Sequence, residues 1–222
     1  MDLRLNDGRE KYRLFYGRNL AEMPKLVADA RVPINTKQVI ERRLEVFRNS
    51  DNELKETWMD NYFDTGDAIL YHPDGRVKIV LDSQILRGMS LESKRIDGAL
   101  ILSEEIYSSS LGLELKPEQI KKMDNEKTLT AEQVKGHPIW KYLLREDEGL
   151  LEESIDILFS EMNRRFSYSE GMGVYLDHPS RLPKARTLSI RRLEGWSAAV
   201  ARGFFNDGGG LGRLVGVNSQ NH

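Results

Sequence analysis

The stretch that decides the fold is DAILYHPDGRVKIVLD, residues 67–82, which has the pattern of a β-hairpin. Pro73 favours a type I turn because its ring fixes φ at the first central position. Gly75 can take the left-handed conformation that closes a three-residue loop. This loop sets the register of the two strands, and the expected cross-strand pairs are His72 with Arg76, Tyr71 with Val77, Ile69 with Ile79 and Asp67 with Leu81.

The predicted register sorts the hairpin side chains onto two faces. One face carries Ile69, Tyr71, Val77, Ile79 and Leu81, and the other carries Ala68, Leu70, His72, Arg76, Lys78 and Val80. A two-residue Asp-Gly loop would instead place Tyr71 opposite Lys78 and mix the two sets. Because a slip of one residue moves every side chain of a strand to the opposite face, we adopt the register that keeps the sets apart.

Amphipathic helices are expected on both sides of the hairpin in the sequence. Asn35 and Gln38 form a capping box ahead of residues 36–48, where apolar residues recur at helical spacing. Ser50 or Asp51 can cap a second helix directly afterwards. Shorter helices are expected to start at Pro117 and after Thr130.

The longest helix is predicted over residues 148–166. Its apolar stripe consists of Leu151, Ile155, Leu158, Phe159, Met162 and Phe166. Acidic residues at its start and Arg164 and Arg165 at its end complement the helix dipole. We interpret its carboxylates as a solvated face, made of Glu152, Glu153, Asp156 and Glu161.

The remaining apolar runs predict short strands. They are expected over residues 12–16 in an otherwise irregular region 1–34, over residues 98–102 as a third strand beside the hairpin, and over residues 173–177, 185–193 and 211–217. The segment 196–205 fits a strand and a helix equally well. The expected fold class is α+β, with mostly antiparallel β-hairpins or a meander covered by amphipathic helices. We expect a single domain over residues 1–222; the alternative is two intimate halves, residues 1–128 with the hairpin and residues 129–222.

Composition narrows the class of protein. The chain has 222 residues, 39% of them hydrophobic and 31% charged, as in an ordinary globular protein. It has no cysteine, which excludes disulfides, thiolate nucleophiles and thiolate metal sites. Charges stand where a signal peptide needs an apolar core, and no apolar run approaches the roughly 18 residues of a membrane span. We expect a cytoplasmic protein that binds no membrane and no cofactor.

Charge is unevenly placed along the chain, although the formal net charge is only −2. Residues 99–163 hold 7 basic and 14 acidic residues, a net charge of −7, whereas residues 164–222 hold 9 basic and 4 acidic residues, a net charge of +5. We favour docking of the acidic middle on the basic end within one fold. The alternative is an anionic partner for the basic end.

Two motifs resemble catalytic or phosphate-binding loops, but their context in the sequence is wrong. Ser197 lies in the segment GWSAA, a relaxed form of the nucleophile elbow, yet the only histidine after it is the terminal His222. The glycines from Gly208 to Gly216 lack the helix that opens a phosphate loop. We interpret Ser197 as a turn serine and the glycines as a hairpin turn.

Three histidines, His72, His137 and His178, precede prolines, which places them at turns or at the ends of elements. With Asp74 or Asp177 they could form a metal site, but their separations of 65 and 41 residues match no ligand-spacing motif. We therefore expect solvated turn histidines and no metal.

The strongest functional signal is a basic and aromatic set near the end of the chain. Its members are Arg181, Lys184, Arg186, Arg191, Arg192, Trp196, Arg202 and Arg213, with Phe204 and Phe205 among them. Strands that present arginines and stacking rings can hold single-stranded nucleic acid. Adjacent arginines on a strand, however, point to opposite faces, and the whole chain is slightly acidic.

These observations leave three hypotheses for function. The leading one is a non-enzymatic protein-interaction or regulatory domain, binding a partner protein or itself. The first alternative is a nucleic-acid-binding protein that uses the basic set. The second is a hydrolase with a dispersed active site, with Ser197 or the turn residues His72 and Asp74 as the first candidates; no catalytic residue is assigned.

Overall fold

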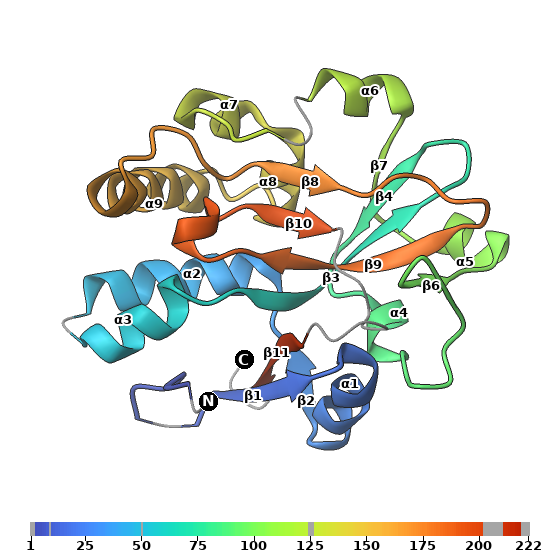
Figure 1. Ribbon diagram of the computed structural model, residues 1–222, viewed down its shortest axis with the longest axis horizontal. Helices are drawn as coiled ribbons and strands as arrows, with labels where there is room; N and C mark the ends of the chain where they lie inside the picture. Colours follow the sequence, from blue (N-terminus) through green and yellow to red (C-terminus); the bar gives the residue numbers. More distant parts are fainter. Residues whose placement is uncertain (1–2, 9, 50, 124–126, 202–210, 219–222) are drawn as a thin grey trace.

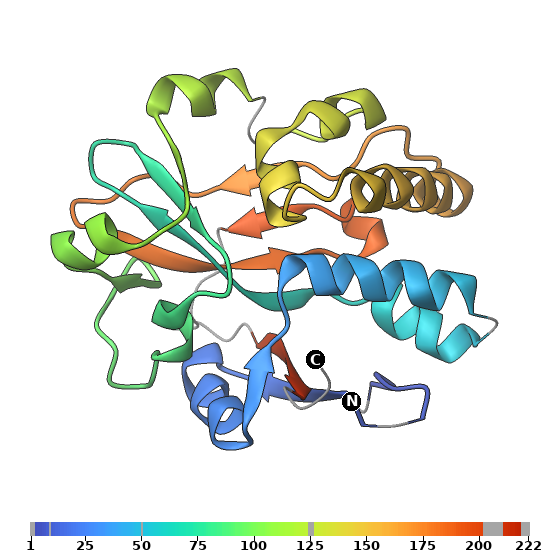
Figure 2. The same ribbon diagram turned by 180° about the vertical axis from the view of Figure 1, so that it is seen from behind.

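The computed structural model describes residues 3–8, 10–49, 51–123, 127–201 and 211–218. Within these residues the chain folds into nine α-helices and a sheet of 11 strands. Figures 1 and 2 show β3, β9 and β10 in the middle of the molecule, with helices on both sides of the sheet and β1 at its margin. The predicted α+β class is confirmed.

Helices and strands are interspersed in the first half of the chain, whereas α6 to α9 follow one another and precede the last four strands. The helices are α1 (Asn19–Ala28), α2 (Thr36–Arg48), α3 (Asn52–Met59), α4 (Gln84–Arg87), α5 (Glu104–Ser109), α6 (Pro117–Lys122), α7 (Ala131–Gly136), α8 (Pro138–Leu143) and α9 (Glu148–Phe166), with a 3₁₀ turn η1 (Leu193–Gly195). The strands are β1 (Tyr12–Gly17), β2 (Arg31–Pro33), β3 (Phe63–Tyr71), β4 (Val77–Val80), β5 (Arg95–Ile96), β6 (Ala99–Ile101), β7 (Leu113–Leu115), β8 (Val174–Leu176), β9 (Lys184–Ile190), β10 (Ala199–Ala201) and β11 (Gly212–Asn218).

The main path of the sheet runs in the order β1-β11-β3-β9-β10-β8. Strand β2 also pairs with β11, β4 pairs with β3 and β7, and β6 pairs with β5 and β9. Pairing is mostly antiparallel, but β10 runs parallel to β8 and β11 runs parallel to β3. The first strand lies beside the last, and strands from both sides of residue 128 are hydrogen-bonded to each other.

The hairpin of β3 and β4 has the predicted turn and register. Tyr71 pairs with Val77, and the amide of His72 donates to the carbonyl oxygen of Arg76 over 2.9 Å. Gly75 closes the loop with φ +92°, which glycine adopts without a side-chain clash. Side chains on both faces of β3 and β4 are buried, except for the partly buried Val80.

The predicted pair of Asp67 with Leu81 does not form, since the pairing of β3 with β4 ends at Ala68 and Val80. The buried Asp67 carboxylate instead binds two backbone amides. It accepts hydrogen bonds from the amides of Thr36, over 2.8 Å, and Asp82, over 3.0 Å. One carboxylate thus joins the start of α2 to the end of the hairpin, and its burial raises the pKa of Asp67.

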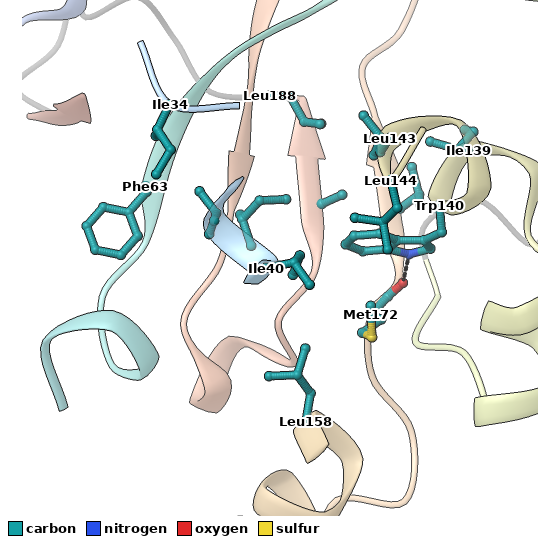
Figure 3. Close-up of a cluster of buried hydrophobic side chains, with 14 of the residues drawn as sticks. Ile34, Ile40, Phe63, Ile139, Trp140, Leu143, Leu144, Leu158, Met172 and Leu188 are labelled. Carbon is teal, nitrogen blue, oxygen red and sulfur yellow. Dashed lines mark hydrogen bonds between the residues drawn. The ribbon is translucent and has the colours of Figure 1, made fainter. Parts of the chain in front are cut away.

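Two hydrophobic cores lie against the sheet. The larger one takes side chains from α2, α3, α7, α8 and α9, and Figure 3 shows part of it, with Ile40, Trp140 and Leu158 from three helices and Leu188 from β9 in one cluster. The indole of Trp140 also donates to the carbonyl oxygen of Met172. The smaller core takes its helical side chains from α1, α4 and α5. Burial of these apolar side chains is the main favourable term of folding.

Helix boundaries follow the capping residues. Asn35 and Gln38 form the expected reciprocal capping box at α2, and the Asp51 carboxylate caps α3 through the amide of Leu54. Helix α9 spans the predicted residues and ends at Ser167, which is left-handed with φ +60°. These caps satisfy amides and carbonyls that a helix leaves free at its ends.

Three expectations about the elements were wrong or left open. The region 1–34 is not irregular, since α1 forms there with Pro24 inside it. Residues of β6 pair with β9 and β5 instead of the hairpin, because β9 and β7 occupy the hairpin's two outer edges. The open segment 196–205 contains the strand β10 up to Ala201. Among the described residues, no helix is both long and apolar enough to cross a membrane.

Candidate interaction surface

Two residues of the predicted basic set, Lys184 and Arg186, are buried in the central strand β9. Both bind one carboxylate: Nζ of Lys184 lies 2.7 Å and Nε of Arg186 lies 2.6 Å from Oδ2 of Asp177. The Arg186 guanidinium also donates to the carbonyl oxygens of Asp97 and Gly98. Buried cations require such partners, and these contacts keep both side chains away from a ligand.

The shared carboxylate has a perturbed pKa. Burial acts to raise the pKa of Asp177, but the hydrogen bonds and charges of Lys184 and Arg186 outweigh burial and hold it below its ordinary value. Asp177 therefore stays ionised at neutral pH and compensates both cations inside the fold.

The other described arginines of the basic set are exposed or partly exposed. Arg181 is exposed before β9 begins, whereas Arg191 and Arg192 are exposed after it ends, so they stand at opposite ends of that strand. Arg192 forms an ion pair with Glu194 over 2.7 Å. Arg202, Phe204, Phe205 and the glycines 208–210 lie outside the described residues.

Arg191 and Arg213 meet around tyrosine rings. The Arg213 guanidinium lies 4.5 Å from the ring centroid of Tyr62 and 5.7 Å from that of Tyr16, and the Arg191 guanidinium lies 5.8 Å from that of Tyr62. These are cation–π distances. Within the described part of the chain, neither arginine forms an ion pair with a carboxylate.

An exposed tryptophan continues this surface. Trp196 is 40% exposed, and its ring centroid lies 5.7 Å from that of Tyr168, which in turn stacks on Phe166. Trp196 and Arg191 belong to the same short loop between β9 and β10, in which the Arg191 side chain lies close to the backbone of Gly195. We call Tyr16, Tyr62, Tyr168, Arg191, Trp196 and Arg213 the Arg–aromatic surface.

A buried arginine holds the loops that carry this surface. Arg43 of α2 is fully buried, and its Nη2 donates to the carbonyl oxygens of Asn61, over 3.1 Å, and Arg191, over 2.9 Å. Its Nε donates to the carbonyl oxygen of Trp58, and its Nη1 lies 3.2 Å from Oγ of Ser197. One guanidinium thus joins the segment before Tyr62 to both ends of the loop that presents Arg191 and Trp196.

The sequence contained a signal for Arg43 that was not used. Arg43 stands three residues after Ile40 and four before Phe47, which places it on the apolar stripe of α2. A charged residue at such a position must find buried partners. Burial lowers the pKa of Arg43 to about 10, so it remains charged at neutral pH.

A buried acid fixes β11 under the surface. Asp64 accepts hydrogen bonds from the side chain of Asn19, over 3.1 Å, from the hydroxyl of Ser189, and from the backbone amide of Arg213, over 3.0 Å. Burial raises the pKa of Asp64. Its carboxylate binds the backbone of Arg213 and not the guanidinium, which leaves that cation to the tyrosines.

The hydrolase candidates Ser197 and His72 are not brought together in the structure. Ser197 is buried, and its loop is followed by strand β10, whereas a nucleophile elbow needs a helix there. Both ring nitrogens of His72 face carboxylates, Nδ1 at 2.7 Å from Asp74 and Nε2 at 3.0 Å from Glu104. Among the described residues, no group of three or more histidine, aspartate or glutamate side chains is placed to hold a metal ion.

Charge pairing also differs from the expectation. The described ion pairs of the acidic middle reach mainly residues before position 99: Asp147 pairs with Lys37, and Glu114 with Arg76. Glu161, expected on a solvated face, is buried and bonds Arg164 and Lys55. Apart from the pair of Glu161 with Arg164, no ion pair of the described chain joins the acidic middle to the basic end.

Comparison with known proteins gives a fold but no family. No protein-family model and no curated protein matches the sequence. A solved chain described as "Accommodation of massive sequence variation in Nanoarchaeota by the C-type lectin fold" matches with a TM-score of 0.67 at 14% sequence identity. The match covers 96% of this chain and 100% of the other. At this identity the similarity shows a shared C-type lectin type of fold.

Proposed function

We propose that this chain is a non-enzymatic interaction domain that binds a protein partner through the Arg–aromatic surface. The observation that supports it is the pairing of Arg191 and Arg213 with tyrosine rings and with no carboxylate of the described chain. Partly exposed cations of this kind can accept carboxylates from another molecule. Arginine, tyrosine and tryptophan are also the residues that dominate the energy of protein interfaces.

The rigidity of the surface favours binding. Arg43 holds two of its loops from below, so less conformational entropy is lost when a partner immobilises them. The related nanoarchaeal chain is described as accommodating massive sequence variation by the C-type lectin fold. A scaffold that tolerates variation suits a domain whose surface residues determine which partner it binds.

Nucleic-acid binding is the alternative for the same residues. It requires an extended basic track, because its affinity comes mainly from several phosphate contacts. Of the predicted set, Lys184 and Arg186 are buried, Arg192 has an ion pair and Arg181 stands at the far end of β9. The two remaining described arginines favour a protein ligand with a few carboxylates.

The test compares capture of partners by matched variants. We expect a partner that binds the wild-type domain to be lost from an Arg191→Ala, Trp196→Ala double variant and retained by Leu111→Ala, a substitution at an 89% exposed residue outside the surface. The purified partner should then bind the double variant at least about tenfold more weakly in calorimetry.

Two results would contradict the proposal. If labelled single-stranded oligonucleotides bind at low salt and lose affinity in the double variant, the ligand is nucleic acid. If the double variant and Leu111→Ala retain the same partners with equal affinity, the Arg–aromatic surface is not the binding site.

A further inference from the structure

The first strand, β1, has one hydrogen-bonding edge without a strand beside it. It pairs only with β11, in the register Tyr12 with Val217 through Gly17 with Gly212. Figures 1 and 2 show β1 at the margin of the sheet, next to α1. In an antiparallel strand, alternate residues turn their amide and carbonyl groups to opposite edges.

The flanking contacts show which residues face outwards. The amide of Asn218 donates to the carbonyl oxygen of Lys11, so Lys11 faces β11 and, by alternation, so do Arg13 and Phe15. On the other edge, the Asn6 side chain binds both the amide and the carbonyl oxygen of Tyr12.

Leu14 and Tyr16 follow Tyr12 at intervals of two residues. Their backbone amide and carbonyl groups therefore point to the edge of β1 that faces away from β11. Among the described residues, no hydrogen bond reaches these groups. Unpaired edge strands are templates for another extended segment.

A groove runs beside this edge, between β1 and α1. Its volume is about 540 Å³ and it is lined by Arg13, Leu14, Phe15, Tyr16, Glu22, Lys25, Ala28 and Asp29. The groove leaves room for the side chains of a bound peptide next to the outward backbone groups of Leu14 and Tyr16, as recognition of an extended peptide requires.

The lining of the groove carries two cations and two carboxylates, and the cations are the more exposed. Arg13 pairs with Asp29 and Lys25 pairs with Glu22, but the cations are the more exposed members of each pair. The Arg13 and Lys25 side chains are 55% and 64% exposed, against 32% for Asp29 and 13% for Glu22. A ligand in this groove would therefore meet two cations first.

We propose that an extended, acidic segment of a partner protein adds to the sheet as a strand beside β1. Its backbone would bond the outward groups of Leu14 and Tyr16, and its carboxylates would lie near Arg13 and Lys25. This site goes beyond the Arg–aromatic surface and shares only Tyr16 with it. The proposal stands even if that surface binds nothing.

The first experiment measures amide hydrogen exchange with selected peptides. Random octapeptides are selected on the immobilised domain, and one enriched peptide is added to the free protein. The amides of Leu14 and Tyr16 should exchange at least about tenfold more slowly in the complex, whereas those of Arg13 and Phe15 are already protected by β11. Enriched peptides should be acidic and bind more weakly at high salt.

A proline variant tests the same edge without opening the fold. Leu14→Pro removes an amide that bonds nothing in the described chain, as edge strands tolerate. It should weaken the peptide about tenfold or more, whereas Leu14→Ala, which loses the same side chain, should retain affinity within about threefold. Urea unfolding verifies that both variants are folded.

Three outcomes would overturn the proposal. The first is a selection that enriches no peptide, and the second is enriched peptides that bind Leu14→Pro as tightly as Leu14→Ala. The third is a concentration-dependent dimer of the wild type in light scattering that Leu14→Pro abolishes. In that case the edge pairs with a second copy of this chain.

Discussion

Replacement of Arg43 tests how the fold supports the Arg–aromatic surface. The guanidinium makes four hydrogen bonds, to the carbonyl oxygens of Trp58, Asn61 and Arg191 and to Oγ of Ser197. No carboxylate of the described chain forms an ion pair with it. Arg43→Met keeps the length of the side chain but removes every donor, and Arg43→Lys keeps the charge but not the planar arrangement of donors.

The expected loss of stability follows from the contacts. A hydrogen bond to a charged group contributes roughly 1.5–3 kcal/mol, so four bonds give an upper limit of roughly 6–12 kcal/mol. The true value is lower, because replacing the cation also removes its desolvation cost and water can reach some of the carbonyl groups. We expect about 4 kcal/mol for Arg43→Met and about 2 kcal/mol for Arg43→Lys, since an ammonium can serve only part of this arrangement.

Urea unfolding measures the change in the free energy of unfolding. Quenching of tryptophan fluorescence measures how accessible the loop that carries Trp196 is to solvent. Trp196 is the exposed tryptophan, so its quenching by iodide should rise in both variants, while Trp58 and Trp140 remain buried. Lys135→Met on α7 is the control, because its ammonium and the carboxylate of its partner, Glu132, are exposed, so its loss should change neither stability nor quenching. A loss below about 1 kcal/mol for Arg43→Met, or unchanged quenching, would refute the supporting role of Arg43.

Two further substitutions test particular contacts. Gly112→Ala places Cβ 2.1 Å from the carbonyl oxygen of Ile79 and should cost about 2 kcal/mol or more in urea unfolding, whereas Gly149→Ala, in open space on α9, should be neutral or stabilising. Asp177→Asn should cost about 3 kcal/mol at pH 7, because two buried cations lose their charge partner. Since the folded pKa of Asp177 is lowered, its contribution is present above the ordinary carboxyl pKa of about 3.9 and is lost as pH falls below it, so the two unfolding curves should converge in acid.

Features encoded by neighbouring residues were predictable from the sequence. The turn at Pro73 and Gly75 fixed the hairpin register, and the capping residues Asn35 and Asp51 marked where α2 and α3 begin. Each signal depends on contacts within a few residues, so no knowledge of the sheet was needed. Helix α9 was predictable because 19 residues carry one continuous apolar stripe.

Features that depend on distant partners were not predictable in this way. Helix α1 forms despite Pro24 because Leu20, Met23 and Leu26 complete the smaller core, and tertiary burial outweighs the helix propensity of one residue. The basic set looked like one surface because sequence patterns do not show which cations are buried. Asp177 lies seven residues from Lys184, but only the sheet brings their side chains together.

The distribution of carboxylates explains why the free cations lie at the surface. The carboxylate of Asp177 forms ion pairs with both Lys184 and Arg186. The Asp64 carboxylate accepts a hydrogen bond from the backbone amide of Arg213. A buried cation without a compensating charge is costly, so the carboxylate of Asp177 stabilises the fold most by pairing with buried cations. Arg191 and Arg213, which solvent and aromatic rings can stabilise, form no ion pair with a carboxylate of the described chain. Under the proposed function, the positive charge offered to a partner is a consequence of how the interior is neutralised, and a partner that supplies carboxylates would complete the pairing.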